Sequence, residues 1–329
     1  MAESVTVLVP ALDESASIDA CLLSVRAQTH RDLHIVVVDN GSTDDTRDRV
    51  RAHASADPRV ELVEHPQRSI PGALNAGLQA ARGTWLVRVD AHSTVPPDYV
   101  ARAVERLGTG RWAGVGGRKD AVARTGAGKA IAAVLGSRLA VGGSVYHHGD
   151  TVQEVDHIPF GAYPTSLVRQ LGGWREDIAN NEDFEFDQRL RAHGPLLFDP
   201  ELRISWHGKE TVGDLFAQYR RYGTGKPAVA LAHPASVSPR HLLPPALVAW
   251  LAGAATAVPR RPGLAAAMAA PYLLVVGACS ASIVRDLPDD AEPTTVPAAL
   301  VAMQVGWGVG FWEGAARLVR GGWRRPRRA

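Results

Sequence analysis

The sequence predicts an α/β protein followed by an α-helical membrane region, and three observations support this fold class. Up to about residue 240, short β-branched runs alternate with amphipathic segments, the pattern of parallel strands joined by crossover helices. Polar clusters directly follow three of the runs, at the strand ends where open α/β sheets bind ligands. After residue 241 the composition changes to three long apolar stretches that contain no Asp, Glu, Lys or Arg.

Length and composition limit the possible classes of protein. The 329 residues suggest about two domains at roughly 150 residues each, and we predict them at 1–240 and 241–329. With 46% hydrophobic and 21% charged residues the chain is a folded protein, neither disordered nor collagen-like. The net charge of +2 gives no reason to expect a nucleic-acid partner.

The start of the chain predicts a cytoplasmic location for the first domain. Glu3 and a strand-like run replace the basic and apolar regions of a signal peptide. Cys21 and Cys279 lie far apart in apolar stretches without metal-ligand neighbours, so we expect two buried thiols.

The predicted elements follow in order along the first domain. A strand at 5–9 precedes a helix within 15–29, where apolar residues recur at helical spacing. A second strand at 34–38 stops at the turn-rich cluster 39–45, and a third at 84–89 ends at Asp90-Ala-His92. Further along, residues 184–190 predict an amphipathic helix that begins just after three polar residues, 181–183.

The three apolar stretches are at 242–258, 263–284 and 296–312. A membrane span needs about 20 apolar residues, so the second is long enough and the other two are borderline. If all three cross, Arg260, Arg261 and the arginine-rich tail from Arg317 to Arg328 lie outside, which inverts the positive-inside rule. We therefore predict an interfacial or re-entrant segment at 242–258 and spans at about 263–284 and 296–312. Both arginine clusters then face the cytoplasm and the acidic loop 286–292 faces out; a short first span that violates the rule is the alternative.

Two polar clusters after the first two strands predict a ligand-binding edge. Asp13 and Glu14 follow the first strand, although a solvated helix-starting turn explains them equally well. Asp39 follows the second strand, where its carboxylate can accept hydrogen bonds from a base or ribose, and Gly41 would allow close backbone approach. An ordinary strand-to-helix turn is again the alternative. The cluster lacks the G-x-G-x-x-G spacing of dinucleotide-binding proteins.

Asp90 and His92 supply a carboxylate and an imidazole at the end of the third strand. Such a pair can hold a divalent cation between protein and diphosphate. If His92 is a ligand, Mn²⁺ should be accepted at least as well as Mg²⁺, because imidazole suits transition metals better than hard cations.

Two further motifs carry candidate site residues. Glu182 and Asp183 lie at the amino end of a predicted helix, where the dipole favours an ionised carboxylate that can act as a general base; a helix cap is the alternative. Gln218, Arg220 and Arg221 place guanidinium and aromatic groups just before the membrane region. They suit phosphate oxygens or an acceptor groove, or an anionic lipid surface.

Together these motifs resemble family 2 glycosyltransferases of the GT-A fold. The similarity lies in residues 7–14 (VLVPALDE), 36–44 (VVVDNGSTD), 72–77 (GALNAG), 87–92 (VRVDAH) and 181–183 (NED), in this order. Residues 160–163 (FGAY), 171–174 (LGGW) and 218–223 (QYRRYG) resemble the succinoglycan-biosynthesis glucosyltransferase subgroup more specifically. The similarity covers about the first 225 residues, and the usual D-x-D motif is D-x-H here.

The resemblance implies a Rossmann-like mixed sheet and inverting transfer from a nucleoside-diphosphate sugar such as a UDP-sugar. It also implies roles for residues that match the family's motifs: the nucleotide sugar at Pro10, Asp13, Glu14, Asp39, Asp90 and Glu182; a divalent cation, Mg²⁺ or Mn²⁺, at Asp90 and His92; the catalytic base at Asp183; and acceptor or diphosphate at Gln218, Arg220 and Arg221.

The expected protein is therefore a multi-pass enzyme of the inner cell membrane, with a cytoplasmic catalytic domain and a lipid-linked or glycolipid acceptor. Membrane confinement raises the effective concentration of such an acceptor. Homo-oligomers remain open. The alternatives are a polyprenyl-phosphate sugar synthase and a non-catalytic membrane module that binds a nucleotide sugar. A membrane-tethered dinucleotide oxidoreductase lacks its glycine fingerprint.

Overall fold

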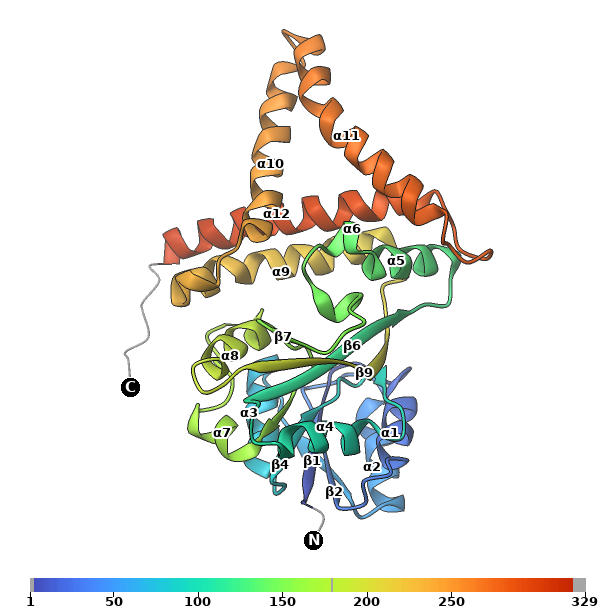
Figure 1. The fold of residues 1–329 in the computed structure, drawn as a ribbon, viewed down its shortest axis with the longest axis vertical. Coiled ribbons are helices and arrows are strands. Elements are labelled where there is room, and N and C mark those ends of the chain that lie inside the picture. Colours follow the sequence, from blue (N-terminus) through green and yellow to red (C-terminus); the bar gives the residue numbers. More distant parts are fainter. Residues whose placement is uncertain (1–2, 179, 322–329) are drawn as a thin grey trace. The chain divides into compact units, whose positions relative to one another are not determined.

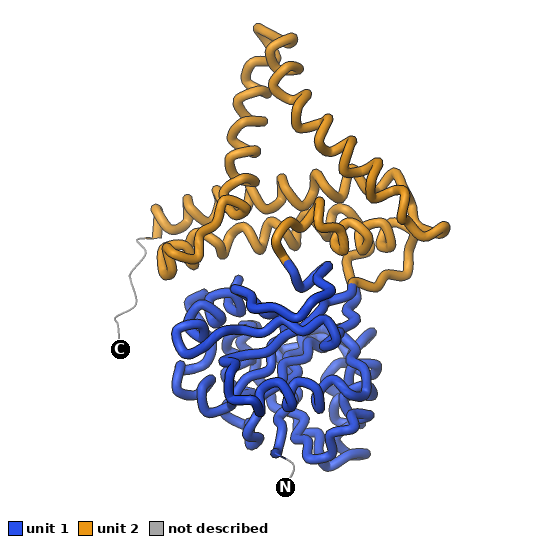
Figure 2. Tube along the Cα trace, in the orientation of Figure 1, with its two compact units in different colours: residues 1–120, 145–207 blue, residues 121–144, 208–329 orange. Residues whose placement is uncertain are grey.

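The computed structural model describes residues 3–178 and 180–321, which divide into two compact units (Figure 2). The first comprises residues 1–120 and 145–207, and the second 121–144 and 208–329. The units thus divide at places other than residue 240, because segments 121–144 and 208–240 pack with the apolar helices. Each unit is described by itself. The predicted Arg324, Arg325, Arg327 and Arg328 lie outside the described residues.

The first unit is built around a mixed sheet with helices on its two faces (Figure 1). Its elements are β1 (Val5–Ala11), α1 (Ile18–Arg26), β2 (Leu33–Asp39), α2 (Thr46–Ala56), β3 (Val60–Glu64), α3 (Ile70–Ala80), β4 (Trp85–Arg88), β5 (Ser93–Thr94), α4 (Tyr99–Gly108), β6 (Gly114–Val122, whose last two residues belong to the second unit), η1 (Val145–His147), β7 (Gln153–Val155), β8 (Ala162–Pro164), α7 (Thr165–Gln170), α8 (Glu182–Leu190) and β9 (Leu196–His207).

The strand order is β3-β2-β1-β4-β8-β6-β9-β5, and β7 also pairs with β9. The pairs β3–β2, β2–β1 and β1–β4 are parallel, as predicted for strands joined by crossover helices. The pairs β4–β8, β8–β6, β9–β5 and β9–β7 are antiparallel. The expectation of a wholly parallel sheet is therefore wrong beyond β4, and the mixed sheet that the resemblance implies is confirmed.

Both faces of the parallel half are buried. In β1, Val7 and Val9 belong to one hydrophobic cluster and Leu8 to the other, and all three are fully buried. Parallel strands covered by helices on both sides read as continuous apolar runs, as β1 and β2 do. The strand ends extend slightly past the predicted ones, so that Asp39 is the last residue of β2. The carboxyl ends of β1, β2 and β4 then meet at one edge of the sheet.

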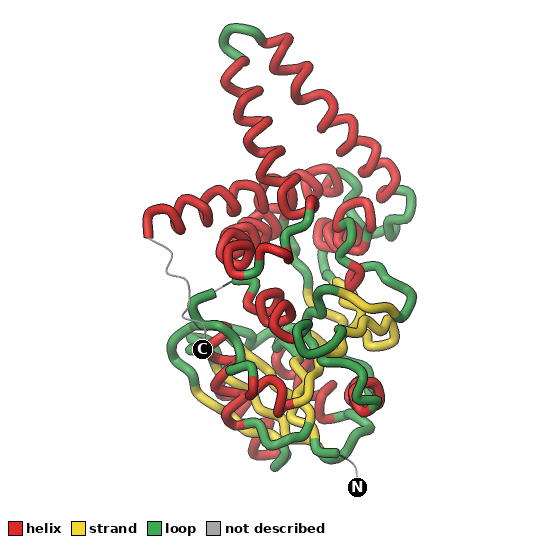
Figure 3. The backbone as a smooth tube through the Cα atoms, turned by 60° about the vertical axis from the view of Figure 1, so that its left-hand side comes forward, coloured by secondary structure: helices red, strands yellow, loops and turns green. Residues whose placement is uncertain are grey.

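The second unit is helical (Figure 3). It consists of α5 (Gly126–Gly136), α6 (Arg138–Val141), α9 (Val212–Ala232), η2 (Pro234–Ser236), α10 (Pro239–Ala257), α11 (Pro262–Val284) and α12 (Thr295–Gly321). α10 and α11 form a hairpin, and α12 lies along α9 (Figure 1). Arg260 and Arg261 occupy the turn at the tip of the hairpin.

A row of glycines brings α12 against α9. Gly306, Gly310 and Gly314 are four residues apart, and a Cβ added to each would lie 2.8, 2.0 and 2.3 Å from backbone carbonyl oxygens of α9. Small residues at this spacing allow helix backbones to approach closely. This packing explains why α9 groups with the apolar helices.

Within residues 3–178 and 180–321, two helices are long and apolar enough to cross a membrane by length and composition, α11 and α12. They differ in burial: 11% of the most apolar window of α11 is buried inside the structure, against 50% for α12. α11 exposes large apolar side chains, including Leu273, Leu274 and Val275. α12 instead has α9 and α10 as neighbours.

The acidic turn between α11 and α12 contacts α5. Lys129 of α5 forms an ion pair with Asp290, and the Glu292 backbone N–H donates to the Gly126 carbonyl (2.9 Å). Only residues 123–125 separate α5 from β6 of the sheet. This turn is therefore held beside α5 within the second unit.

Candidate active site

The loops that follow β1 and β2 interlock at the edge of the sheet. The Asn40 backbone N–H donates to the Ala11 carbonyl (2.8 Å), and the Glu14 backbone N–H donates to the Thr46 hydroxyl (2.7 Å). Pro10 lies within β1, opposite Val38 of β2. The predicted nucleotide-binding residues of these two loops therefore share one location.

Asp13 fastens these loops to a third one. Its backbone is left-handed (φ 54°), and its carboxylate accepts from the Thr43 backbone N–H (2.7 Å) and pairs with Arg68 (2.7 Å). Arg68 is itself left-handed (φ 51°). The hydrogen bond from Thr43 holds the pKa of Asp13 below its ordinary value. Asp13 is thus an ionised carboxylate at the junction of three loops.

Asp39 is almost fully buried and already has partners. One carboxylate oxygen accepts from Arg47 Nη2 (2.9 Å) and Nε (3.1 Å), and the other accepts from the Ser42 backbone N–H (3.3 Å). Gly41 adopts φ 81°, and a Cβ there would lie 3.1 Å from the Pro66 carbonyl oxygen. The chain thus needs glycine at this position for its own packing.

Arg88 connects the two predicted carboxylate motifs. Its Nε donates to Asp90 Oδ1 (2.8 Å), its Nη2 lies 3.3 Å from Asp90 Oδ2, and its Nη1 lies 3.6 Å from Glu182 Oε1. The guanidinium is buried, so the charges it faces compensate its own desolvation. This one cation interacts with the carboxylates of Asp90, Glu182 and Asp183, although Asp90 is distant in the sequence from the other two.

His92 is oriented by Glu14. Its Nδ1 lies 2.9 Å from Glu14 Oε1, while Glu14 Oε2 accepts from the Ser17 hydroxyl (2.6 Å). A carboxylate on Nδ1 fixes the tautomer that leaves the Nε2 lone pair free for a metal. The ring also packs edge-on against Trp206, with centroids 6.3 Å apart. Glu14 therefore orients His92, the predicted metal ligand. A contact between Glu14 and the nucleotide stays a prediction.

The donor set at Asp90 and His92 fits a divalent cation that is shared with a substrate. Residues 3–178 and 180–321 contain no group of three or more His, Cys, Asp or Glu side chains placed to hold a metal by themselves. Magnesium-type sites often use one or two protein ligands and take the others from substrate phosphates and water. One carboxylate and one oriented imidazole meet that description.

Helix α8 presents the predicted base. Asn181 has left-handed backbone (φ 64°), so the helix begins at Glu182, and the helix predicted at 184–190 is confirmed with Glu182 and Asp183 in its first turn. Asp183 accepts from the Phe184 backbone N–H (2.7 Å), and its side chain is 32% exposed, whereas Glu182 is buried. Asp183 is thus positioned by the protein yet open to a reactant.

The two neighbouring carboxyls have opposite pKa shifts. Burial raises the pKa of Glu182, and the Asp183 charge adds to this effect. Burial alone would also raise the pKa of Asp183, but the positive charges of His157 and Arg88 outweigh it and the pKa falls below its ordinary value. Asp183 is therefore ionised at neutral pH, the state that a general base requires.

Several site residues were not predicted from the sequence. Lys119 of β6 lies over the rings of Trp206 (3.9 Å) and Phe160 (4.8 Å), and Phe160 has left-handed backbone (φ 55°). Arg88, a charged residue inside an apolar strand, was a signal that could have been used. His157 and Asp187 were also missed, although Asp187 follows Asp183 by one helical turn.

The predicted acceptor residues lie on α9, in the second unit. Gln218 donates to the Tyr222 hydroxyl (2.9 Å), and Arg220 pairs through Nε and Nη2 with both carboxylate oxygens of Glu313 on α12 (2.7–3.0 Å). Arg221 is exposed. The guanidinium of Arg220 thus joins two helices, and the acceptor role of these three residues stays a prediction.

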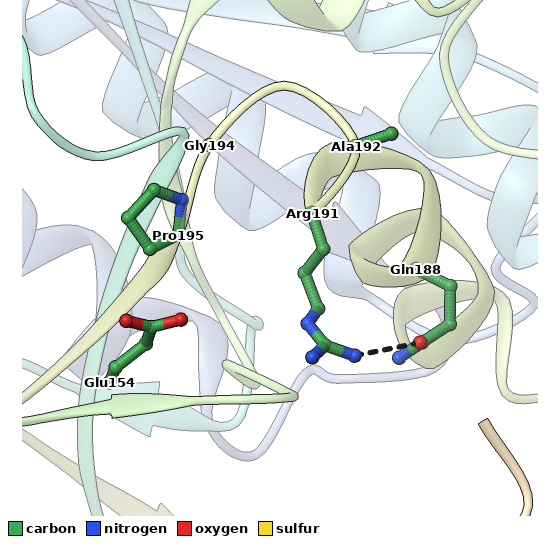
Figure 4. Close-up of a pocket in the computed structure, with 6 residues that line it drawn as sticks. All are labelled: Glu154, Gln188, Arg191, Ala192, Gly194 and Pro195. Atoms are coloured by element: carbon green, nitrogen blue, oxygen red, sulfur yellow. Dashed lines mark hydrogen bonds between the residues drawn. The ribbon is translucent and has the colours of Figure 1, made fainter. Parts of the chain in front are cut away.

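A surface pocket at the other end of α8 contains none of the predicted residues. Figure 4 shows Glu154, Gln188, Arg191, Ala192, Gly194 and Pro195 around it. Arg191 donates to Gln188 (3.1 Å). The lining of the pocket includes none of the site carboxylates described above, so this pocket is not assigned to the site.

Comparisons with known proteins agree with the fold. The family described as "Glycosyl transferase family 2" matches residues 6–135. The chain is 30% identical to the succinoglycan biosynthesis protein ExoA of Rhizobium meliloti (strain 1021), over 93% of both chains.

Two solved structures share the fold. The mannosyltransferase PcManGT from Pyrobaculum calidifontis, in complex with GDP-Man and Mn²⁺, has a TM-score of 0.62 at 20% identity, covering 95% of this chain and 88% of that one. GalNAc-T7 with UDP, GalNAc and Mn²⁺ has a TM-score of 0.52 at 15% identity, covering 63% of this chain and 43% of the other.

The mixed sheet, with carboxylates at the carboxyl ends of β1, β2 and β4, is the GT-A fold that these solved glycosyltransferases share. The similarity to ExoA extends along nearly the whole of both chains, and it narrows the assignment from a fold to a family. The chain belongs to glycosyl transferase family 2.

Proposed function

We propose that this glycosyltransferase transfers a sugar, with inversion, from a nucleoside-diphosphate sugar such as a UDP-sugar to a hydroxyl of a lipid-linked saccharide in polysaccharide or glycolipid synthesis. The observation that carries the proposal is the cluster around Arg88. It brings Asp90, at the predicted diphosphate end, together with Asp183, an ionised and half-exposed carboxylate. Inverting transfer needs a base and a leaving diphosphate close to one another.

The proposed reaction follows from these positions. Asp183 takes the proton of the acceptor hydroxyl, the oxygen forms a bond to the anomeric carbon, and the bond to the diphosphate oxygen breaks on the opposite face. A divalent cation bound at Asp90 and His92 would neutralise charge on the departing diphosphate. Arg88 holds the Asp90 carboxylate in position, Glu14 orients His92, and Asp13 holds the nucleotide loops in place.

The acceptor class rests on different support. ExoA is named for succinoglycan biosynthesis, and a chain with candidate membrane helices meets lipid-linked acceptors at high effective concentration. We therefore place the enzyme, as a multi-pass protein, in the inner membrane with its catalytic unit in the cytoplasm. Assays with polyprenyl phosphate and with a lipid-linked sugar as acceptors separate this proposal from a polyprenyl-phosphate sugar synthase.

Asp183→Asn tests the catalytic role. The amide cannot take the acceptor proton, so transfer should fall by about 10²–10⁴-fold. Donor binding, measured by calorimetry with Mn²⁺ present, should stay close to that of the parent protein. Asp48→Asn, which removes an exposed carboxylate on α2, is the matched control and should keep full activity. Turnover retained in Asp183→Asn would refute the base assignment.

A further inference from the structure

Behind Asp183, one turn further into α8, lies a second carboxylate that the reaction above does not use. Asp187 is fully buried, and its Oδ2 lies 2.6 Å from His157 Nδ1 and accepts from the Ile158 backbone N–H (2.8 Å). Its Oδ1 is buried without a hydrogen-bond partner. A buried carboxylate with one unpaired oxygen needs a positive charge close by, and His157 is the group in contact with it.

The other ring nitrogen of His157 faces the base. His157 Nε2 lies 3.9 Å from Asp183 Oδ2, within ion-pair range although longer than a hydrogen bond. The rings of Tyr146 and Phe184 pack on the imidazole, each with centroids 5.4 Å away, and the side chain is 11% exposed. The imidazole therefore has one charged partner on each side and little freedom to turn.

We propose that His157, held by Asp187, is a positioning residue: as an imidazolium it faces Asp183 and keeps that carboxylate ionised and oriented toward the acceptor. This inference rests on the proposed role of Asp183 as base. His157 itself takes no proton from the acceptor; it acts through the carboxylate.

The charges around His157 support its protonated form. Burial alone would lower the pKa of His157, but the hydrogen bond to Asp187 and the charge of Asp183 outweigh it and raise the pKa. Burial raises the pKa of Asp187 to about 6. The other titratable and charged groups near this pair are Asp156 on the same loop, His147 on η1, Tyr163 on β8, Lys119 on β6, Arg88 on β4 and Glu182 on α8.

The acid limb of the pH profile of kcat depends on the charge of Asp183. Transfer needs ionised Asp183, so kcat falls as the pH drops through the pKa of this carboxyl. A positive charge within about 4–6 Å lowers the pKa of an Asp by about 1–3 units. Removing the charge of His157 should therefore move the acid limb of the kcat profile to higher pH by about 1–3 units.

The test uses His157→Asn and His157→Gln in the full-length enzyme, with saturating donor and acceptor. Asn keeps a hydrogen-bond donor near the Nδ1 position, facing Asp187, but carries no charge. Both variants should show the shifted acid limb, with donor KM changed by less than about threefold. His193→Gln, at an exposed position after α8, is the control.

The outcomes are separable. A shifted limb in His157→Asn supports the proposal. An unshifted acid limb in both His157 variants, or the full parent profile in His157→Asn, overturns the proposal. His157 would then be only a structural link between its loop and α8. Should the His157 variants fail to fold, a His157 ring that NMR titration of the parent enzyme shows to be neutral throughout the pH range of full kcat overturns it equally. Turnover retained in Asp183→Asn refutes the proposed function instead, whatever the His157 variants do.

Discussion

At the scale of single residues, pairing explains why charged groups gather at one edge of this sheet. Arg88 joins Asp90 to Glu182, Arg68 joins Asp13 to a third loop, and Glu14 joins His92 to Ser17. Each charge that is removed from water has a partner of opposite sign or a hydrogen-bond donor. These contacts within the protein hold the charged side chains of the site in place.

Glu14→Gln should weaken Mn²⁺ binding. Removing the carboxylate that orients a histidine ligand typically costs about 10–100-fold in metal affinity. Affinity is measured from the free-Mn²⁺ signal in electron paramagnetic resonance titrations with nucleoside diphosphate present. The chain offers a matched control in Glu61→Gln, which disrupts the similar pair between Glu61 and His34 on the outer strands. Unchanged Mn²⁺ affinity in both Glu14→Gln and His92→Gln would contradict the assignment of His92 as a ligand.

The sequence predicts the acidic residues of the site better than their partners. Asp39 and Asp90 could be located because a carboxylate directly after an apolar strand lies at the ligand edge of a sheet. The roles of Arg88 and His157 were not predicted, because they depend on contacts with α8, which is distant from both residues in the chain. The ion pair between Asp39 and Arg47 was not predicted either, because it depends on the conformation of the turn between these two residues.

At the scale of secondary-structure elements, the contact between α9 and α12 depends on glycine. Gly310→Val would place a side chain where even a Cβ lies 2.0 Å from the Arg220 carbonyl oxygen. Overpacking of this kind costs about 1–3 kcal/mol. We expect a lower thermal midpoint in detergent and weaker packing of α9, with the Arg220–Glu313 pair disrupted.

Gly277→Ala is the matched control for that substitution. Gly277 lies in α11, also an apolar helix, and a Cβ added there meets nothing within 4 Å. Alanine has a higher helix propensity than glycine, so the thermal midpoint should stay equal or rise slightly. Equal midpoints for Gly310→Val and Gly277→Ala would show that α9 and α12 are not packed as described.

The same scale shows which parts of the fold were predictable. The helix after Asp183 and the first strands follow from apolar periodicity and were confirmed. The antiparallel strands after β4 were not predicted, because β7 and β8 have only three residues each and leave no clear alternation. The Gly-rich segment around β6 gives an equally weak strand pattern, because glycine has no side chain to contribute to the alternation. Gly116 and Gly117 pack directly against Ile158 and Leu202.

At the scale of the whole molecule, the contacts within the second unit bear on membrane topology. The predicted arrangement places the 286–292 turn outside and uses α11 and α12 as spans. However, Asp290 and Glu292 bind α5, which is only three residues from β6, and α12 packs along α9. These contacts hold the 286–292 turn beside α5 and α12 beside α9, and from them we propose a hairpin of α10 and α11 in the bilayer as the alternative to spans at α11 and α12.

Cysteine labelling distinguishes the two arrangements. In a chain with Cys21 and Cys279 replaced by alanine, single cysteines are placed at Arg260 and at Asp289. With the hairpin across the bilayer, a membrane-impermeant maleimide should label position 260 in intact cells and position 289 only after permeabilisation. Arg51→Cys, exposed on α2, is the cytoplasmic control. The reverse pattern would favour the arrangement with the 286–292 turn outside.

The two arginines at the tip of the hairpin bear on how the protein is made. Moving an arginine across the bilayer centre costs about 2.5–3.5 kcal/mol on insertion scales, and Arg260 and Arg261 must cross together when α10 and α11 enter as a pair. Spontaneous insertion after release from the ribosome would meet this barrier while exposing a bare apolar hairpin to the cytosol. A hairpin of α10 and α11 that crosses the bilayer would therefore need a translocation channel that accepts both helices during translation.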